Sequence, residues 1–511
     1  MTQSVKLTRL TGGTIHTLDP QRPLVDSLTV AGGRVAATDE NGEGTLDLGG
    51  RCVLPGFSDA HTHFATWAIG LSQARLEGCR SREEAVARVS GAAAGAPAGG
   101  WVRGLGWRDA DWPEPPTREA LDEACGPVPV ALMSRDYHSL WVSTAGLALA
   151  GGDLQVPGGV VELGEDGSPS GVLREDAAWR FRDRFLRPTE AEMETAIRAA
   201  LPVAAARGVT AIHDKDGWVG VLPVWQALEA SGDLTLRVWQ SLPHHRIDEL
   251  ADLGIRSGFG SDRVRIGYLK AFMDGTLGSQ TARMLDGSGV EITSREALET
   301  ILRRGARAGF PVAVHAIGDK ANRDALDAFQ ATRDHWAPRG LRPRVEHAQL
   351  LAPEDVGRFA ELGVAVSVQF SHAPSDRALA DDTWGERAEL AYAWRALSES
   401  GAVLANGSDA PVEELDPLAG LRAAVCRTLD ERPPWRPEQA IDVETALRAM
   451  IQGPAWLAHD EHRRGLLVPG FDADLVVLDR DPLDCPADEL SEIRVEATMV
   501  AGEWTHAGPF G

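Results

Sequence analysis

Both ends of the chain contain short segments in which apolar and polar residues alternate and which turn at glycines. Alternation with a period of two, interrupted by glycine, is typical of β-strands joined in hairpins. Neither end offers enough strands to be stable alone, so the sequence predicts one small β-sandwich built from residues 1–55 and 463–511. The segments that show this pattern are residues 5–18, 27–38, 44–56, 465–479 and 497–505.

Between these ends, short apolar runs alternate with segments that have the spacing of amphipathic helices, such as residues 321–336. This alternation is typical of parallel strands joined by helical crossovers, and eight such strands can close into a (β/α)8 barrel. We therefore expect an α/β fold with a TIM-type barrel over residues 56–462. The predicted barrel strands are residues 53–61, 208–214, 235–242, 264–274, 311–319, 343–350, 363–370 and 402–411.

One long stretch, residues 64–187, interrupts the alternation directly after the first predicted barrel strand. It is rich in glycine, proline and tryptophan, as in GAPAGGWVRGLGWRDADWPEPP. Connections longer than about 12–15 residues are often lids or binding loops, so we interpret this insertion as a cover over a substrate pocket. A structural insertion without a part in the chemistry is the alternative.

Composition and charge narrow the class of partner. The chain has 511 residues, of which 43% are hydrophobic and 25% charged, as in a soluble globular protein with a large core. Its formal charge of -24 repels nucleic-acid phosphates and anionic membrane surfaces, so neither is an expected partner. A small-molecule substrate is expected instead, and a homo-oligomer is among the open options.

The cysteines and the first residues indicate a cellular compartment. The five cysteines are widely spaced, odd in number and never arranged as C-x-x-C, which argues against a disulfide framework or a zinc finger. No segment has the apolar character of a signal peptide or a membrane helix. The sequence therefore predicts a cytoplasmic protein.

Histidine and aspartate residues stand at the ends of several predicted barrel strands. His61 and His63 are two positions apart at the end of the first strand, so both imidazoles can project from the same face. His315, His347 and Asp409 end three further strands. A lone histidine there would more often be a packed core residue, but the carboxyl ends of barrel strands meet where catalysis occurs. Since imidazole and carboxylate ligands suit zinc, iron, manganese or nickel, a divalent-metal site is predicted.

Lys270 lies in the strand before the one that carries His315. Buried lysines lose basicity readily, so this amine can take up carbon dioxide and form a carbamate that bridges two metal ions. The alternative is a structural lysine paired with a carboxylate, such as that of Asp274. The sequence leaves both interpretations open.

Several residues of the insertion are candidates for contact with the substrate. Its tryptophans, Trp107 among them, would form an apolar wall around a hydrophobic substituent, or else the small core of the insertion itself. His138 and Arg135 lie in the same region and are candidates for orienting the substrate.

The chain resembles the amidohydrolase superfamily, in particular its YtcJ-like branch, which includes N-substituted formamide deformylases. The resemblance rests on LPGFSDAHTHF, KAFMDGTLGSQTA, VAVHAIGDKA, EHAQL and NGSDAPV. It extends to RDYHSLWVSTAGL and PGGVVELGEDGSPSGVLRE in the insertion and to GLLVPGFDADLVVLD near the end of the chain. What it implies for the metal site is that one ion is held by His61, His63 and Asp409 and a second by His315 and His347, with a carbamylated Lys270 between them.

The same resemblance implies hydrolysis of an amide-type C–N bond of a small molecule, such as an N-substituted formamide, by a metal-activated hydroxide. Asp409 would accept the proton of that hydroxide and pass it to the departing amine. After the seventh predicted strand the sequence reads QFSHAPSD, which places His372 near the mouth of the barrel as a candidate substrate contact. Zinc is the expected metal, with one or two ions per chain.

Two alternatives stay open at this stage. A mononuclear deaminase of an amino-heterocycle would bind a single ion, with His347 holding the water and Lys270 uninvolved. The second alternative is a barrel that binds a small molecule without catalysing a reaction, because a fold alone does not establish activity. The number of metal ions per chain separates the deaminase from a binuclear hydrolase.

Overall fold

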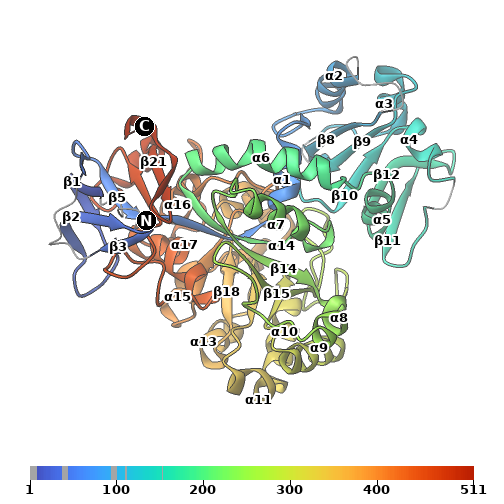
Figure 1. Cartoon of the computed structure of the whole chain (residues 1–511). Helices are drawn as coiled ribbons and strands as arrows, with labels where there is room; N and C mark the ends of the chain where they lie inside the picture. Colours follow the sequence, from blue (N-terminus) through green and yellow to red (C-terminus); the bar gives the residue numbers. More distant parts are fainter. Residues whose placement is uncertain (1–7, 37–43, 94–99, 110–111, 152–153, 511) are drawn as a thin grey trace.

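Figure 1 shows three parts: a sheet formed by both ends of the chain, a central barrel surrounded by helices, and an inserted domain on the side away from the terminal sheet. Within the part of the chain that is described, no helix combines the length and the apolar character that crossing a membrane requires. This computed structural model describes residues 8–36, 44–93, 100–109, 112–151 and 154–510. Outside the described residues lie parts of the predicted terminal strands and of the insertion, namely residues 5–7, 37–38, 94–99, 110–111 and 152–153.

Strands from both ends of the chain are joined in one eight-stranded sheet. Its centre is β5 (Cys52–Pro55), which pairs in parallel with β1 (Thr8–His16) and antiparallel with β20 (Leu475–Leu478). Ile15 and Val477 are among the side chains that fill the core on one face. A sandwich of two packed sheets stays a prediction. The other strands are β2 (Leu24–Ala31), β3 (Arg34–Ala36), β4 (Gly44–Asp47), β21 (Val495–Val500) and β22 (Glu503–His506).

Eight parallel strands form the central barrel, each paired with the next in chain order. The last strand returns beside the first, where the Asp409 N–H donates to the His61 carbonyl at 2.7 Å, so the ring is nearly closed. The predicted TIM-type barrel is thereby confirmed. Its strands are β6 (Phe57–Thr62), β13 (Val209–Asp214), β14 (Arg237–Pro243), β15 (Val264–Phe272), β16 (Val312–Ala316), β17 (Arg344–His347), β18 (Ala365–Val368) and β19 (Leu404–Asn406).

The first predicted barrel strand, residues 53–61, is two strands in the structure. β5 belongs to the terminal sheet and β6 to the barrel, with Gly56 between them. A Cβ atom at position 56 would lie 2.2 Å from the Thr210 side chain on the neighbouring barrel strand. Only glycine therefore lets the chain pass so close to the barrel as it leaves the terminal sheet.

Helices cover the outside of the barrel between its strands (Figure 1). The first of them begins with a capping box, in which the Thr189 side chain accepts from the Glu192 N–H and the Glu192 carboxylate accepts from the Thr189 N–H. The segment 321–336, predicted as one helix, is divided in the structure between α10 (Asp319–Ala331) and α11 (Arg333–Trp336). The helices are α6 (Glu190–Ala206), α7 (Leu222–Ala230), α8 (Ile247–Asp252), α9 (Arg295–Ala308), α10 (Asp319–Ala331), α11 (Arg333–Trp336), α12 (Pro353–Val356), α13 (Arg358–Leu362), α14 (His372–Trp384), α15 (Trp394–Glu399), α16 (Pro417–Cys426) and α17 (Val443–Leu457).

The insertion after β6 folds as a small domain around a six-stranded sheet. Trp107, Trp112 and Trp141 pack together there, with ring centroids 5.8 to 6.4 Å apart. These three tryptophans therefore form a core of the insertion itself. The strands are β7 (Ala74–Arg75), β8 (Val102–Trp107), β9 (Val130–Ser134), β10 (Ser139–Val142), β11 (Gly159–Leu163) and β12 (Pro169–Glu175), and the helices are α1 (Phe64–Gly70), α2 (Arg82–Ala93), α3 (Arg118–Cys125), α4 (Thr144–Ala148) and α5 (Asp176–Phe185).

Candidate metal centre

The carboxyl end of the barrel opens into a cavity of about 600 Å³ whose wall includes every residue predicted to bind metal or substrate. Residues of the inserted domain line it as well, so this domain forms one wall of the cavity. The predicted metal ligands reach it from five strands: His61 and His63 from the end of β6, Lys270 from β15, His315 from β16, His347 from β17, and Asp409 from the segment after β19.

Asp409 lies at the centre of the histidines. Its Oδ1 is 3.4 Å from His61 Nε2 and 3.7 Å from His63 Nε2. Two ligands about 2.1 Å from one tetrahedral ion lie roughly 3.4 Å apart, so this spacing fits atoms that share an ion. On the other side, Oδ2 is 3.9 Å from His347 Nδ1 and 3.9 Å from His372 Nε2. The carboxylate therefore stands between two groups of imidazoles.

The backbone is strained at two of the predicted ligands. Asp409 has φ 58° and His347 has φ 75°, in the left-handed region that non-glycine residues seldom adopt. Such conformations cost about 1–3 kcal/mol each and persist where the surrounding structure enforces them, commonly at active sites. At both positions the strain turns a side chain into the cavity.

Buried carboxylates hold the first two histidines in place. His61 Nδ1 donates to Glu346 at 2.9 Å, and His63 Nδ1 donates to Asp216 at 3.0 Å. Each bond fixes the tautomer and leaves the Nε2 lone pair of the ring directed at Asp409. A carboxylate behind a histidine is the usual support of a metal ligand in proteins.

The protonation of the histidines suits metal binding. Burial lowers the pKa of His61, His315 and His347 well below the usual value, so these rings are neutral and keep a lone pair. Burial acts in the same direction on His63, but the hydrogen bond to Asp216 and the charges of Asp216 and Asp409 together outweigh it, and the pKa of His63 is raised. An ion bound at this site would compete with that proton.

Lys270 has a buried amine without a hydrogen-bond partner among the described residues. Burial lowers the pKa of Lys270 to about 8, so part of the population is the neutral amine that can react with carbon dioxide. The alternative pairing with Asp274 is not formed, because that carboxylate accepts the backbone N–H groups of Ile317, Gly318 and Arg283 at 2.9 to 3.0 Å. An orphaned polar atom aimed into the cavity indicates a missing partner.

Sequence analysis missed Glu346, which the structure places directly behind the site. It is fully buried, and besides His61 it faces Arg344 Nε at 2.9 Å and Lys215 Nζ at 3.0 Å. Both nitrogens lie within ion-pair distance of the Glu346 carboxylate, although neither is aligned to donate a hydrogen bond to it. Burial would raise the pKa of Glu346, but Arg344 and Lys215 hold it well below the usual value. The glutamate therefore stays charged and balances Arg344 together with Lys215, whose pKa burial lowers to about 7.

Replacing Glu346 with glutamine is expected to lower the free energy of unfolding by roughly 3–5 kcal/mol, because Arg344 and Lys215 lose their buried counter-charge. Metal affinity should fall as well, by about 10–100-fold, since His61 loses the carboxylate that orients it. Urea denaturation and metal analysis measure the two effects. The exposed Glu354→Gln variant is the matched control, and a Glu346→Gln protein with the parent midpoint and metal content would contradict this account.

His372 lies in the wall of the cavity, at the beginning of α14, where its side chain is buried. Its ring stacks on that of His347 with centroids 6.3 Å apart. Because Nδ1 accepts from Gln349 at 3.2 Å, Nε2 carries the proton and faces Asp409. His372 is thus next to the predicted ligands.

Arg135 and Trp107 line the cavity but have partners within the protein. Arg135 forms an ion pair with Glu413 and donates to the Ser375 hydroxyl at 2.7 Å, which ties the insertion to the barrel loops. Trp107 is 1% exposed, and its Nε1 donates to the Leu132 carbonyl at 2.8 Å. Both contacts favour a structural contribution over direct contact with substrate.

His138 lies in a different setting. It is held by Glu175, a second residue that could not be identified from the sequence. Its Nδ1 donates to Glu175 at 2.6 Å, and both side chains are buried. Glu175 has φ 52° and also accepts from the Thr281 hydroxyl at 2.9 Å. The His138 ring lies 6.4 Å from that of His315, centroid to centroid. The insertion therefore presents an oriented imidazole beside the predicted metal ligands.

Comparisons with known proteins identify the family of the chain. Residues 44–506 match the model of the amidohydrolase family. The protein LONG AFTER FAR-RED 3 of Arabidopsis thaliana is 32% identical over 97% of this chain and 90% of its own length. The N-substituted formamide deformylase of Arthrobacter pascens is 27% identical over 96% of each chain.

Among solved structures, an uncharacterized metal-dependent hydrolase from Pyrococcus horikoshii matches with a TM-score of 0.78 and 28% identity. The match covers 94% of this chain and 99% of that one. These findings confirm the resemblance that the motifs indicate, from the terminal strands to the barrel. The chain belongs to the amidohydrolase family.

Proposed function

We propose that this metal-dependent hydrolase cleaves a C–N bond of a small molecule, with N-substituted formamides as the leading substrate class. The observation that carries the proposal is the ligand set around Asp409, which opens into a cavity large enough for a small organic molecule. The deformylase of Arthrobacter pascens, similar over 96% of each chain, supports this choice of substrate class.

The residues fit a divalent ion, for which zinc is our proposal. One ion would be held by His61, His63 and Asp409, and a second by His315 and His347. The amine of Lys270, which has no hydrogen-bond partner within the part of the chain that is described, is suited to carboxylation, which would supply an oxygen ligand to both. When bound, such ions supply an acidified water and polarise a carbonyl oxygen.

Asp409 is the proposed proton carrier. Its two carboxylate oxygens face different histidines, so it can hold a proton on the side of the cavity and stay fixed by its backbone bond to His61. Burial raises the pKa of Asp409, an effect that His372 and His63 reduce, which makes the carboxylate a better proton acceptor than an exposed aspartate. The proton would then pass to the departing nitrogen, with His372 Nε2 adjacent to Oδ2.

Aromatic side chains favour a substrate with an apolar group on nitrogen. Trp218 and Phe272 line the cavity together with ring centroids 5.5 Å apart, and Trp179 and Tyr137 lie on the side of the insertion. Flat, partly exposed rings of this kind stabilise bound apolar groups. The scissile carbonyl would then lie toward Asp409.

His138 is proposed as the residue that contacts the substrate from the insertion, with Glu175 as the residue that positions it. Since Nδ1 is bound to Glu175, the remaining Nε2 is available on the side of the cavity. An imidazole so held can donate a hydrogen bond to the carbonyl oxygen or to the departing nitrogen. The insertion would then take part in the reaction as well as cover the cavity.

Replacing His138 with asparagine should lower kcat by roughly 10²–10³-fold, the typical effect of removing one such donor, with little change in KM. Glu175→Gln should show a smaller loss of the same kind, and Glu175→Asp should restore part of it. Steady-state kinetics on the best formamide measure both. The exposed Glu165→Gln variant of the same domain is the control, and a change confined to KM would show that His138 only binds substrate.

Formate release from a panel of N-substituted formamides, measured together with metal content on protein purified without added metal, tests the proposed function. Two metal ions per chain with formate release are expected. Ammonia release from amino-heterocycles with one ion per chain would instead indicate a mononuclear deaminase. Substrate-panel binding without any turnover by the metal-loaded protein would indicate a silent binding barrel.

A further inference from the structure

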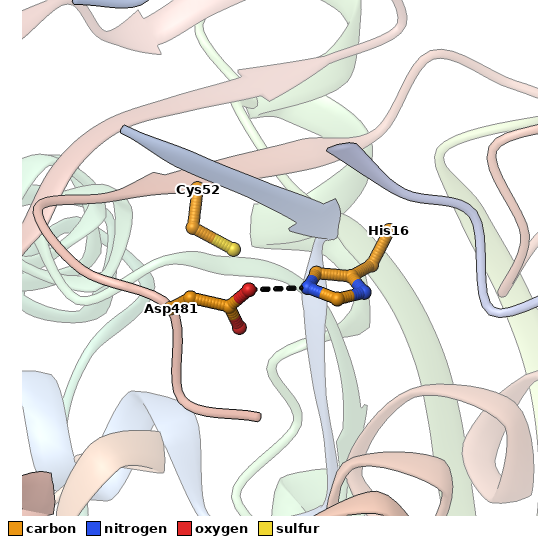
Figure 2. Close-up of side chains that lie close together, drawn as sticks. All are labelled: His16, Cys52 and Asp481. Carbon is orange, nitrogen blue, oxygen red and sulfur yellow. Dashed lines mark hydrogen bonds and ion pairs between the residues drawn. The ribbon is translucent and has the colours of Figure 1, made fainter. Parts of the chain in front are cut away.

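A second group of metal-binding side chains lies in the terminal sheet, outside the barrel cavity. His16 ends β1, Cys52 begins β5, and Asp481 follows β20. The strands β1, β5 and β20 are neighbours, with β5 in the middle. The three residues therefore lie side by side at the same end of these strands. Figure 2 shows the imidazole, the thiol and the carboxylate facing a common space.

The three side chains are close enough to share one ion. A hydrogen bond of 2.7 Å joins His16 Nε2 and Asp481 Oδ2, which an ion bound to both would replace, and one ligand atom from each of the three residues lies within 4.8 Å of the others. Cys52 is fully buried, whereas the side chains of His16 and Asp481 are 11% and 17% exposed. Solvent therefore reaches one side of the group, where a water molecule can complete a tetrahedral coordination.

The charges around this group favour a cation. The Asp481 carboxylate forms an ion pair with His16 and accepts the Leu483 N–H at 2.9 Å. The nearest arginine in sequence, Arg480, forms ion pairs with Glu489 and Glu492. The Cys52 thiol and the Asp481 carboxylate can both carry negative charge, and within the described residues the His16 imidazole is the one cationic group that pairs with them.

We propose that His16, Cys52 and Asp481 bind one divalent cation with the ligand preference of zinc, separate from the ions of the barrel. Thiolate, imidazole and carboxylate are the three side-chain ligands that zinc takes in proteins, and three of them plus a water make a four-coordinate site. On binding, the thiol loses its proton to solvent and the imidazole binds through a neutral nitrogen. The proposal does not depend on the reaction catalysed in the barrel.

Such an ion would connect the beginning of the chain to its end. The strands that carry Cys52 and His16 come from the first part of the sequence, whereas Asp481 lies in the segment after β20. A cation that binds the folded sheet but not the separated strands stabilises the folded state by mass action. The structural role of the site would be to hold the two ends of the chain in one sheet.

Cobalt(II) titration of the full-length, metal-depleted protein tests the proposal. A cobalt–thiolate bond gives an intense near-ultraviolet charge-transfer band, which the barrel ligands cannot produce because none of them is a cysteine. We expect this band to appear and to saturate at one cobalt ion per chain above those bound in the barrel. Absence of the band at full cobalt loading of the wild-type protein would overturn the proposal.

Variants assign the band to this site. Cys52→Ser and Asp481→Asn should each abolish or strongly weaken it, while formamide hydrolysis or whatever activity the barrel shows is retained. Cys79→Ser, which removes a buried thiol of the inserted domain, is the matched control and should leave the band unchanged. A band that persists in folded Cys52→Ser protein would show that another cysteine binds the cobalt, and the three side chains would then be only a hydrogen-bonded group.

Discussion

Replacing Asp409 with asparagine is expected to lower kcat/KM for the preferred substrate by about 10²–10⁴-fold, the usual contribution of a positioned proton acceptor. Asparagine keeps the size of the side chain and one ligand oxygen, but it cannot accept a proton. The strained backbone at position 409 and the bond to the His61 carbonyl do not depend on the carboxylate. The fold should therefore be preserved, and steady-state kinetics with metal analysis measure the effect.

The exposed Asp382→Asn variant of α14 provides the control for this substitution. Parent activity in metal-loaded Asp409→Asn protein would rule out the proton-accepting role. If activity and metal content fell together and added metal restored both, Asp409 would be a ligand and nothing more. Only a metal-loaded, folded and inactive variant supports the proposed role.

Replacing Lys270 with alanine is expected to reduce the metal content from two ions to one and to lower activity by about 10²–10³-fold, as the loss of several kcal/mol of charge stabilisation implies. The amine has no hydrogen-bond partner among the described residues and lies 4.9 Å from the centre of the Phe272 ring, so its removal breaks no hydrogen bond. Formate or acetate should then restore part of the activity, because a small carboxylate can occupy the space of the missing carbamate.

The control for this experiment is Lys320→Ala, which removes one of the four lysines of the chain from the surface of α10, where it pairs with Asp324. Carboxylate should have no effect on that variant. If Lys270→Ala protein kept both ions and its activity, the lysine would have a packing role only. Rescue by neutral molecules of the same size would point to the same conclusion.

The sequence allows the barrel and the positions of its ligands to be predicted, because both follow from local patterns. Each barrel strand is a short apolar run, and the strand ends are the places where His61, His315, His347 and Asp409 occur. Since the carboxyl ends of parallel strands meet at one end of a barrel, residues far apart in sequence can be placed together without knowing any contact.

The residues that support the site could not be predicted in this way. Glu346 lies two residues after Arg344 on the same strand, but its other partners, Lys215 and His61, come from the ends of other strands, and only packing brings them within reach. Glu175 meets His138 through the pairing of β12 with β10, inside an insertion whose strands show no clear period. Such contacts depend on tertiary structure rather than on sequence spacing.

His372 illustrates a second limit. Its position in the sequence after the seventh strand is consistent with a loop, and the beginning of α14 gives no strong capping signal. The histidine is buried because the helix starts at once and turns it toward His347. Element boundaries are the least certain part of a prediction from sequence, and here a shift of a few residues separates a solvated side chain from one in the wall of the cavity.

The arrangement of β5 between β1 and β20 also constrains how the protein is made. On the ribosome, the strands at the beginning of the chain emerge long before β20 does, so one edge of β5 stays unpaired during most of synthesis. Unpaired strand edges promote association between nascent chains, and pairing over such a long separation is slow. The yield of correctly folded protein should therefore increase at low temperature and low synthesis rate.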